Sequence, residues 1–210
     1  MLKINMHTSN TYKFFKNIFD YILALVILII SSPLNIIIIL CIYFIDGKPI
    51  FFRQKRSGIN CRPFSIIKYR TMLSNRNSNN YSLTEEQRIT KFGNFLRTTS
   101  LDELPNLINV LQGNMSIIGP RPLPIEYNNL YNNIQIRRHS VKPGITGLAQ
   151  VKGRNLLSWD KKFKLDVKYV DSICFLLDIS IILQSISIVL LRKGISSDKS
   201  ATMEPFRGND

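Results

Sequence analysis

Histidine and cysteine are scarce in this sequence, and their placement excludes several kinds of site. Of 210 residues, two are histidine and three are cysteine. His7 and His139 lie far apart without a cysteine neighbour, so neither a zinc site nor a Ser/His/Asp triad is expected. Cys41, Cys61 and Cys174 are odd in number and lack a disulfide-like or metal-binding spacing, which indicates a reducing compartment.

Acidic residues are the other scarce class, and their shortage sets the charge of the chain. Fourteen Asp and Glu face 28 Lys and Arg, which gives a formal net charge of +14. So basic a balance predicts a polyanionic partner, namely nucleic acid, an anionic membrane surface or a phosphorylated substrate. Charge alone does not choose among these. The sequence has no internal repeat, and its length suits one domain with a membrane anchor.

One long stretch lacks charge altogether. From Tyr21 to Ile45 the chain reads YILALVILIISSPLNIIIILCIYFI, which is long enough to span a bilayer. Ser32 and Pro33 lie in its middle. Proline removes a helix hydrogen bond, so we predict a break there, with serine hydroxyls covering the freed carbonyls. A cleaved signal peptide is not expected, because the run is too long and lacks a small-residue cleavage pattern.

Basic residues flank this stretch on both sides. They are Lys3, Lys13 and Lys16 before it and Lys48, Arg53, Lys55 and Arg56 after it. Because basic flanks mark the cytoplasmic side, both ends are expected in the cytoplasm. Each arm of about ten to twelve residues would rise only about 15 to 18 Å, half a hydrocarbon core. We therefore predict a re-entrant helix-break-helix at about residues 18–45, with a kinked helix that crosses the bilayer as the alternative.

The rest of the chain predicts a separate domain, residues 49–210, after an N-terminal segment 1–48. Residues 50–52 and 64–72 have the composition of short strands, joined by a turn around Gly58 and Asn60. The polar stretch 74–82 is expected to be a mobile loop that could act as a lid. The fold class that we expect is α+β, mainly helical, with a small β element and interfacial amphipathic helices.

Two helices are predicted in the middle of this domain. Residues 88–97 carry apolar side chains at helical spacing. The next helix begins at Ser100 and Glu103, which have the S-x-x-E spacing of a capping box, and it stops at Gly113. This second helix is expected to be the best defined in the chain.

Two more helices are predicted near the C-terminus. Residues 159–170 should form a charged helix. Residues 175–190 have apolar residues at helical period, interrupted by Asp178. We expect this helix to lie in the membrane interface, where the aspartate stays wet, and an ordinary core helix is the alternative.

An acidic pair marks the first turn of the helix that begins near residue 100. Asp102 and Glu103 lie where unpaired N–H groups and the helix dipole favour negative charge, so Asp102 should be ionised at neutral pH. Plain helix capping is the alternative interpretation. Pro105 weakens that alternative, because a proline inside the helix would sacrifice the hydrogen bond to Leu101. Arg121, held between two prolines, adds a guanidinium suited to phosphate oxygens.

Several motifs in order carry a resemblance to a known family. The runs RTTSLDELPNLINVLQGNMSIIGPRP (97–122), KYRTM (68–72) and PGITGLAQVKGRN (143–155) closely resemble the bacterial sugar transferases. These are monotopic polyprenyl-phosphate phosphoglycosyl transferases. The resemblance covers nearly the whole chain and implies a small, catalytic-domain-only member, similar to the initiating transferases of bacterial glycoprotein glycosylation. It implies a location at the cytoplasmic face of the bacterial inner membrane.

The resemblance also implies a reaction and roles for individual residues. An aspartate attacks the β-phosphate of a UDP-sugar, releases UMP, and passes the phosphosugar to undecaprenyl phosphate. Carried onto this chain, Asp102 is the nucleophile and a Mg²⁺ ligand, and Glu103 supports it. Arg121 would hold a phosphate and Arg97 would support the acidic site. Substrate contacts are further expected from Arg154 and Asn155.

Two alternatives to this function follow from the same residues. A non-catalytic, membrane-anchored basic scaffold would bind anionic lipid or nucleic acid through its many lysines and arginines. An enzyme without a covalent intermediate would use Asp102 only as a metal ligand. If the protein is a phosphoglycosyl transferase, no nucleic-acid partner is expected. The short chain and its tail favour an N-acetylated amino sugar on UDP, with galactose and glucose left open, and the oligomeric state does not follow from the sequence.

Overall fold

The computed structural model describes residues 10–73, 84–153, 156–191 and 205–208. The predicted loop 74–82 lies outside this part of the chain. The α-helices are α1 (Asn10–Ile30), α2 (Ser32–Ile45), α3 (Glu85–Arg88), α4 (Lys91–Thr98), α5 (Asn106–Leu111), α6 (Leu148–Lys152), α7 (Trp159–Ser172) and α8 (Phe175–Leu191). Short 3-10 helices are η1 (Ile59–Cys61), η2 (Leu101–Glu103), η3 (Ile125–Leu130) and η4 (Gln135–Ser140). The strands are β1 (Phe51–Ser57), β2 (Pro63–Tyr69), β3 (Ser116–Ile118) and β4 (Gly144–Thr146). Helices dominate, as predicted.

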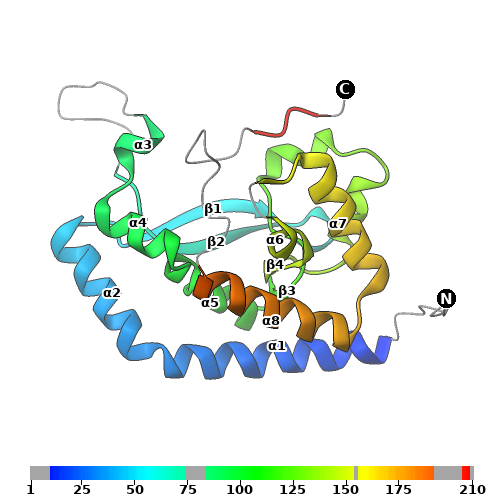
Figure 1. Ribbon diagram of the computed structural model, residues 1–210, viewed down its shortest axis with the longest axis horizontal. Coiled ribbons are helices and arrows are strands. Elements are labelled where there is room, and N and C mark those ends of the chain that lie inside the picture. Colours follow the sequence, from blue (N-terminus) through cyan, green and yellow to red (C-terminus); the bar gives the residue numbers. More distant parts are fainter. Residues whose placement is uncertain (1–9, 74–83, 154–155, 192–204, 209–210) are drawn as a thin grey trace.

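Helices α1 and α2 form a bent pair along one side of the molecule (Figure 1). The bend is 62° and lies at Ser31, one residue before the predicted break. Pro33 falls in the first turn of α2, where its missing N–H costs nothing, and Ser32 Oγ donates to the carbonyl of Ile29 at 2.8 Å. Among the described residues no single helix is long and apolar enough to cross a membrane. Helices α1 and α2 together have the length and apolar composition of such a span.

The first arm is longer than the predicted ten to twelve residues. Helix α1 starts at Asn10 and has 21 residues, because its polar first half folds as part of the same helix. Lys16 and Asp20 are 9% and 3% exposed and lie one turn apart on the side that faces the protein. The opposite side of α1 leaves Phe14, Phe15 and other large apolar side chains exposed.

The strands form two small sheets of two strands each. Strands β1 and β2 form the predicted antiparallel hairpin, with Phe51 opposite Tyr69 and Ser57 opposite Pro63. The first strand extends beyond the predicted residues 50–52 to Ser57 and includes charged residues. Most of its side chains are exposed, so charged residues can be part of the strand. The predicted turn is η1, in which Asn60 adopts a positive φ of 52°. The second sheet pairs β3 with β4 in parallel.

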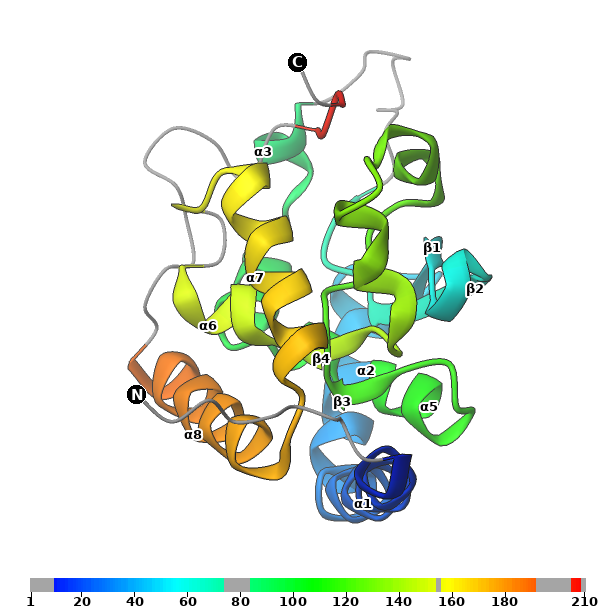
Figure 2. The same ribbon diagram turned by 90° about the vertical axis from the view of Figure 1, so that its right-hand side faces the viewer.

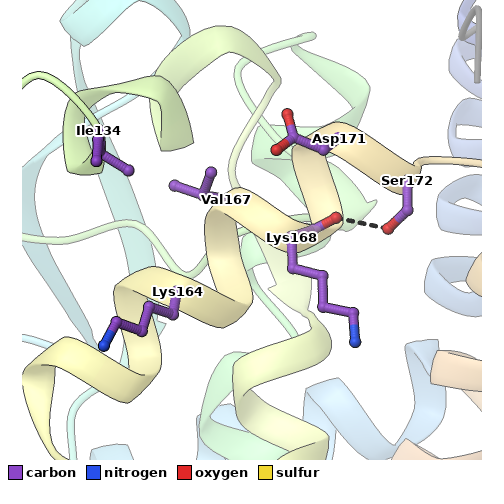
Figure 3. Close-up of a pocket in the computed structure, with 6 residues that line it drawn as sticks. All are labelled: Ile134, Lys164, Val167, Lys168, Asp171 and Ser172. Atoms are coloured by element: carbon purple, nitrogen blue, oxygen red, sulfur yellow. Dashed lines mark hydrogen bonds between the residues drawn. The ribbon is translucent and has the colours of Figure 1, made fainter.

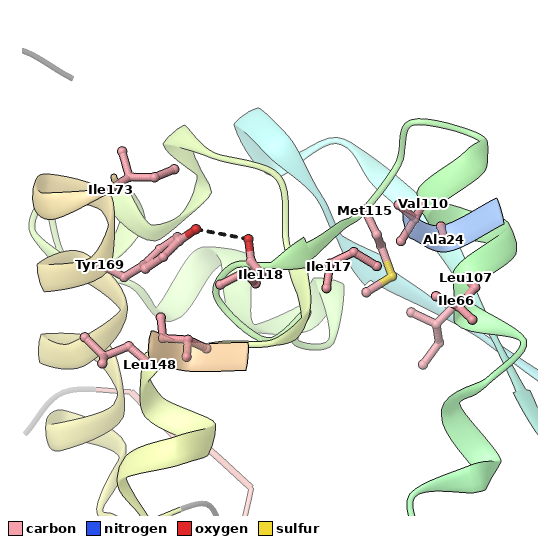
Figure 4. Close-up of a cluster of buried hydrophobic side chains, with 11 residues drawn as sticks. Ala24, Ile66, Leu107, Val110, Met115, Ile117, Ile118, Leu148, Tyr169 and Ile173 are labelled. Atoms are coloured by element: carbon pink, nitrogen blue, oxygen red, sulfur yellow. Dashed lines mark hydrogen bonds between the residues drawn. The ribbon is translucent and has the colours of Figure 1, made fainter. Parts of the chain in front are cut away.

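The main core lies between α1, α5, β3 and α7. It contains Ala24, Ile66, Leu107, Val110, Met115, Ile117, Ile118, Leu148, Tyr169, Ile173 and Ile181, most of which Figure 4 labels. Tyr169 also donates from its hydroxyl to the carbonyl of Ile118 at 3.1 Å. Residues of the bent pair are therefore part of the protein core, and so are residues of α8.

The prediction that Asp178 of α8 stays in contact with water is wrong. Asp178 is 4% exposed, and it accepts hydrogen bonds from Tyr12 at 2.7 Å and Tyr169 at 2.8 Å. Lys16 supplies the opposite charge at 2.9 Å. A buried carboxylate tolerates this position because it is paired and fully hydrogen-bonded. The opposite face of α8 still leaves Phe175, Leu176, Leu183, Ile186 and Leu191 exposed, and α8 runs along the same lower side as α1 (Figures 1 and 2).

Two predicted helix starts also need correction. The helix predicted over 88–97 begins only at Lys91, because Thr90 caps it by accepting from the Gly93 amide at 2.8 Å. The predicted capping box does not form. Ser100 adopts a left-handed φ of 58° and makes no side-chain cap, so the acidic pair lies on η2 and the α-helix starts at Asn106. Pro105 therefore precedes α5 and sacrifices no bond inside it.

Candidate active site

The acidic pair occupies a tight turn between two helices. The left-handed residue Ser100 ends the α4 segment and starts η2, which carries Asp102 and Glu103. Pro105 then fixes the backbone at the start of α5, whose Asn106 accepts a hydrogen bond from the Ile67 amide of β2 at 3.1 Å. The turn is thereby held against the β hairpin, which presents its own charged residues to the same place.

Glu103 is held by two cations. Its Oε1 lies 2.6 Å from Lys68 Nζ and 2.8 Å from Arg121 Nη2. Burial alone would raise the pKa of Glu103, but the charges and hydrogen bonds of Arg121 and Lys68 outweigh it and hold the pKa well below its ordinary range. Glu103 is therefore ionised, and its main effect is to fix an arginine and a lysine beside its neighbour.

Asp102 is largely buried, but its contacts with cations are weaker than those of Glu103. The Asp102 side chain is 13% exposed, and Lys68 Nζ lies 4.0 Å from its Oδ2. Burial raises the pKa of Asp102 to about 6, against the opposing charges of Lys68, Arg121 and Arg97 and with a further rise from Glu103. The start of a helix was expected to favour the ionised form of Asp102, whereas burial at this position instead raises its pKa. A carboxylate of this kind is still largely ionised at neutral pH and keeps its oxygens available.

The predicted arginines fall into two groups. Arg121 contacts Glu103 directly and is 47% exposed, so its guanidinium also reaches solvent. Arg97, in the last turn of α4, lies near enough for its charge to lower the pKa of Asp102. Arg154 and Asn155 lie outside the described residues, and their substrate contacts stay a prediction.

A second ion pair supports the loop that carries Arg121. Arg138 donates from Nη2 to the backbone carbonyl of Arg121 at 2.7 Å and to Asp166 Oδ2 at 2.8 Å. Both Arg138 and Asp166 are almost fully buried. Strand β4 closes the other side of this loop, where the Gly144 amide donates to the Pro120 carbonyl at 2.9 Å. The guanidinium of Arg121 is thus presented by a fixed backbone.

Sequence reasoning missed the cations that come from distant segments. Lys68 belongs to the KYRTM run, but only the β2 register shows that its ammonium faces the acidic pair. Arg56 at the end of β1 and Lys162 on α7 both lie close enough to Arg121 for its charge to lower their pKa values. A weak signal existed for Lys68, because it is the one charged residue of strand β2.

A magnesium ion fits this site only with help from the substrate. Among the described residues there is no group of three or more His, Cys, Asp or Glu side chains that could hold a metal. Mg²⁺ at phosphoryl-transfer sites is commonly bound by one or two carboxylates together with phosphate oxygens and water. Asp102 suits this role better than Glu103, whose Oε1 already accepts from two cations.

A separate cavity lies on the outer side of α7. It has a volume of about 370 Å³ and is lined by Ile134, Lys164, Val167, Lys168, Asp171 and Ser172 (Figure 3). None of the predicted site residues lines it. The candidate active site is instead the cluster of charged side chains around η2, most of which are largely buried.

The chemistry of the site and the family that the sequence matches point to the same class of protein. A carboxylate pair surrounded by lysine and arginine is typical of proteins that act on phosphorylated substrates. Residues 11–192 match the bacterial sugar transferase family. The chain belongs to this family.

Three relatives illustrate the match. The chain is 45% identical over 194 residues to the "uncharacterized sugar transferase EpsL" of Bacillus subtilis strain 168, covering 92% of this chain and 96% of that protein. It is 38% identical to the UDP-glucose:undecaprenyl-phosphate glucose-1-phosphate transferase of Escherichia coli K12, covering 83% of this chain and 40% of that protein. It is 35% identical to the undecaprenyl-phosphate galactose phosphotransferase of Salmonella typhimurium LT2, covering 90% and 43%. The chain thus spans about two fifths of the latter two relatives.

Proposed function

We propose that this protein is a polyprenyl-phosphate phosphoglycosyl transferase. It moves a sugar 1-phosphate from a UDP-sugar to undecaprenyl phosphate and releases UMP, as the first membrane step of glycan assembly. The observation that carries the proposal is the position of Asp102, a buried carboxylate beside Lys68, Arg97 and Arg121 in a chain of this family. The names of the relatives in Escherichia coli and Salmonella typhimurium describe the same reaction class.

The reaction proceeds in two displacements at one phosphorus atom. An Asp102 oxygen forms a bond to the β-phosphorus of the UDP-sugar, the bond to the bridging oxygen breaks, and that oxygen leaves with the electron pair as part of UMP. A phosphate oxygen of undecaprenyl phosphate then bonds to the same phosphorus, and the bond to Asp102 breaks. The second step regenerates the carboxylate, so no external acid or base is consumed.

The cations around the acidic pair match the charge of this substrate. Glu103 keeps Lys68 and Arg121 in place through its two short contacts. Arg121, which is half exposed, can turn its remaining donors to a phosphate without losing the contact to Glu103. These cations reduce the repulsion between the Asp102 carboxylate and the diphosphate, which would otherwise slow the attack. When bound at Asp102 and the diphosphate, Mg²⁺ would neutralise further charge.

The exposed apolar surface of the protein supports a position at the membrane. The outer faces of α1, α2 and α8 expose large aliphatic and aromatic side chains on one side of the molecule. A continuous apolar surface of this kind is unstable in water and suits the membrane interface. In this proposal α1 and α2 re-enter the bilayer as a bent pair, both ends stay on the cytoplasmic face of the inner membrane, and the site meets the lipid phosphate at headgroup depth.

The sugar is left to experiment. The relatives whose names specify a sugar specify glucose or galactose. The N-acetylated amino sugar expected from the length and tail of the chain stays a prediction. A panel of UDP-linked hexoses and N-acetylated amino sugars distinguishes the two.

The experiment that tests the function measures UMP release in nanodiscs. Wild-type protein and Asp102→Asn receive the UDP-sugar panel, Mg²⁺ and undecaprenyl phosphate, with EDTA as a second condition. Release that requires both Asp102 and the metal supports the proposal. Label from a radioactive sugar phosphate should stay on the protein when the lipid is omitted. Turnover without trapped label would favour a metal ligand that makes no covalent bond, and silence with persistent, salt-sensitive lipid binding would favour the scaffold.

A further inference from the structure

Phe206 is a buried residue in an otherwise exposed segment near the C-terminus. It is 6% exposed, whereas Pro205 before it and Arg207 after it are exposed. The segment 205–208 follows α8 in the chain but lies on the opposite, upper side of the molecule, where Figure 1 draws it in red. Terminal segments keep a fixed position only when specific contacts hold them. The contacts of the Phe206 ring therefore show what this segment does.

Four aromatic rings surround Phe206. Its ring centre lies 5.7 Å from those of Tyr127 and Trp159. Phe163 lies at 5.0 Å in an edge-to-face arrangement, and Tyr131 stacks on the same ring at 6.0 Å. The Phe206 amide also donates to the Tyr127 hydroxyl at 3.1 Å. These separations are those of favourable aromatic pairs, so the ring from the C-terminal segment completes an aromatic cluster.

The four rings come from two elements, one of which continues directly from the loop that carries Arg121. Tyr127 lies on η3 and Tyr131 follows its last residue, whereas the other two rings belong to α7. Helix η3 begins at Ile125, a few residues after Arg121. The Phe206 ring therefore joins α7 to the segment that leads out of the candidate active site.

A buried guanidinium lies against two of these rings. The Arg138 guanidinium carbon is 5.8 Å from the centre of the Tyr131 ring and 5.7 Å from that of the Phe163 ring. Its Nη2 donates to the backbone carbonyl of Arg121 at 2.7 Å. Cation–π contacts of this kind restrict where a guanidinium can lie. A continuous series of contacts thus runs from Phe206 through the rings and Arg138 to the backbone of Arg121.

Strand β1 holds the other side of the same loop. The Ser57 amide donates to the Leu123 carbonyl at 3.0 Å. The Tyr127 amide donates to the Pro124 carbonyl at 3.1 Å. Both hydrogen bonds end on carbonyls of the loop, so both should open more often if the loop loses its support. These two amides therefore report the position of the loop independently of any reaction.

We propose that Phe206 is a positioning residue for the transfer reaction, whose ring holds η3 against α7 and thereby fixes Arg121 for the diphosphate of the nucleotide sugar. The ligand assigned to Arg121 rests on the proposed function. The alternative is a ring that only stabilises the fold. Direct contacts between η3 and α7, such as Tyr131 to Phe163 at 5.4 Å, remain without Phe206. Removal of the ring should therefore loosen the loop and leave the domain folded.

The first test compares hydrogen–deuterium exchange of the full-length wild type and Phe206→Ala in nanodiscs. Peptides that contain the Ser57 and Tyr127 amides should exchange about tenfold faster in the variant, because the cavity left by the ring lets η3 move. Peptides from α1 and α5 should exchange as in wild type. Phe206→Leu fills part of the cavity and should give an intermediate rate. Arg207→Ala changes the exposed next residue and should match wild type.

The second test asks whether Phe206 acts through Arg121. UDP carries the diphosphate without a sugar to transfer, and calorimetry measures its Kd for wild type, Phe206→Ala, Arg121→Gln and the double variant. Phe206→Ala should weaken UDP binding about fivefold or more in the wild-type background and have no further effect in the Arg121→Gln background. A ring that only stabilises the fold would change the Kd by the same factor in both backgrounds.

The inference is overturned if Phe206→Ala leaves the exchange of both amides unchanged, if exchange rises equally in α1 and α5, or if the effects on UDP binding are additive. These outcomes differ from a failure of the proposed function. If exchange and UDP binding change as expected but no UDP-sugar yields UMP, Phe206 positions Arg121 and the reaction is wrong. If Asp102-dependent transfer keeps its wild-type kcat and KM in Phe206→Ala, the reaction stands and the role of Phe206 is wrong.

Discussion

Lys16 Nζ lies 2.9 Å from Asp178 Oδ2, although the two residues come from the first and last described helices. Both side chains are less than a tenth exposed. Two tyrosine hydroxyls complete the carboxylate, one from α1 and one from α7. Helices α1, α7 and α8 are therefore joined by a buried charge cluster in which both carboxylate oxygens of Asp178 accept hydrogen bonds.

Removal of this carboxylate should cost much of the stability. Asp178→Ala leaves Lys16 with the weaker contact to Asp20 at 3.6 Å, and the expected loss is about 3 kcal/mol or more because a buried charge loses its main partner. Asp160→Asn breaks an exposed pair with Lys164 at 3.9 Å and should change stability by less than about 0.5 kcal/mol. Thermal unfolding in nanodiscs compares them, and equal effects would contradict the role given to the buried cluster.

Asp102→Asn should stabilise the protein while it abolishes transfer. Because burial raises the folded-state pKa of Asp102 to about 6, the folded protein holds a proton more tightly than the unfolded chain. Ionisation above that pH therefore opposes folding, by about 1 to 3 kcal/mol at pH 7. The gain from Asn should be full above pH 6 and disappear below about pH 4, where Asp102 is protonated in both states. A variant that is less stable than wild type at pH 7 would contradict this.

The pH dependence of activity should carry the same signature. Transfer needs the ionised nucleophile, so kcat/KM for the UDP-sugar should fall as pH drops through about 6, not near 4. Lys68→Gln removes the largest charge that opposes the rise, so the acidic limb should move to higher pH. Lys55→Gln, on the exposed part of β1, should leave the profile unchanged. Bound Mg²⁺ would move the limb in the opposite direction, so the profile is measured at several metal concentrations.

A single methyl group at Gly144 should disturb the loop of Arg121. A Cβ at this position would lie 2.1 Å from the Gly119 amide nitrogen and 2.4 Å from the Thr146 carbonyl oxygen. Since both neighbours are backbone, Gly144→Ala must displace β3 from β4, and we expect a loss of about 1 to 3 kcal/mol together with a fall in kcat. Lys152→Ala, on the exposed side of α6, should change neither.

The topology of the bent pair is tested by cysteine accessibility. Lys13→Cys and Lys55→Cys lie before α2 and after it, on exposed positions, and are placed in a chain whose three native cysteines are replaced. A re-entrant pair keeps both in the cytoplasm, so an impermeant thiol reagent should label neither in intact cells and both after lysis. Labelling of one position in intact cells would establish a kinked helix that crosses the bilayer.

Local sequence signals predicted the segments whose structure is set locally. The Ser-Pro break and the charged helix α7 follow from a proline and from helical periodicity, and each was predicted within a few residues. The β hairpin follows from a glycine turn, but its first strand was predicted too short. The bent pair's length was underestimated, because the pairing of Lys16 and Asp20 with the protein interior makes a polar stretch helical. That pairing depends on Asp178 for Lys16 and on Ser116 for Asp20, and both partners lie far along the chain.

In the site, too, local motifs were predicted from the sequence, whereas contacts between distant segments were not. The acidic pair and Arg121 were predicted from motifs, but which acid has the lower pKa was not. The capping pattern at Ser100 predicted that both acids face a helix dipole, whereas Glu103 instead faces Lys68 from β2 and Arg121 from the following loop.

Ala24, in the middle of α1, is fully buried in the same cluster as Ile66 and Leu107. Ile38 and Ile42 of α2 are buried against Tyr69 and Leu96 in the same way. A protein purified without its first 48 residues would expose these surfaces to water. For crystallisation or inhibitor screening, truncation of the bent pair α1 and α2 is therefore the wrong strategy, and mutation of its outward-facing apolar side chains is the better one.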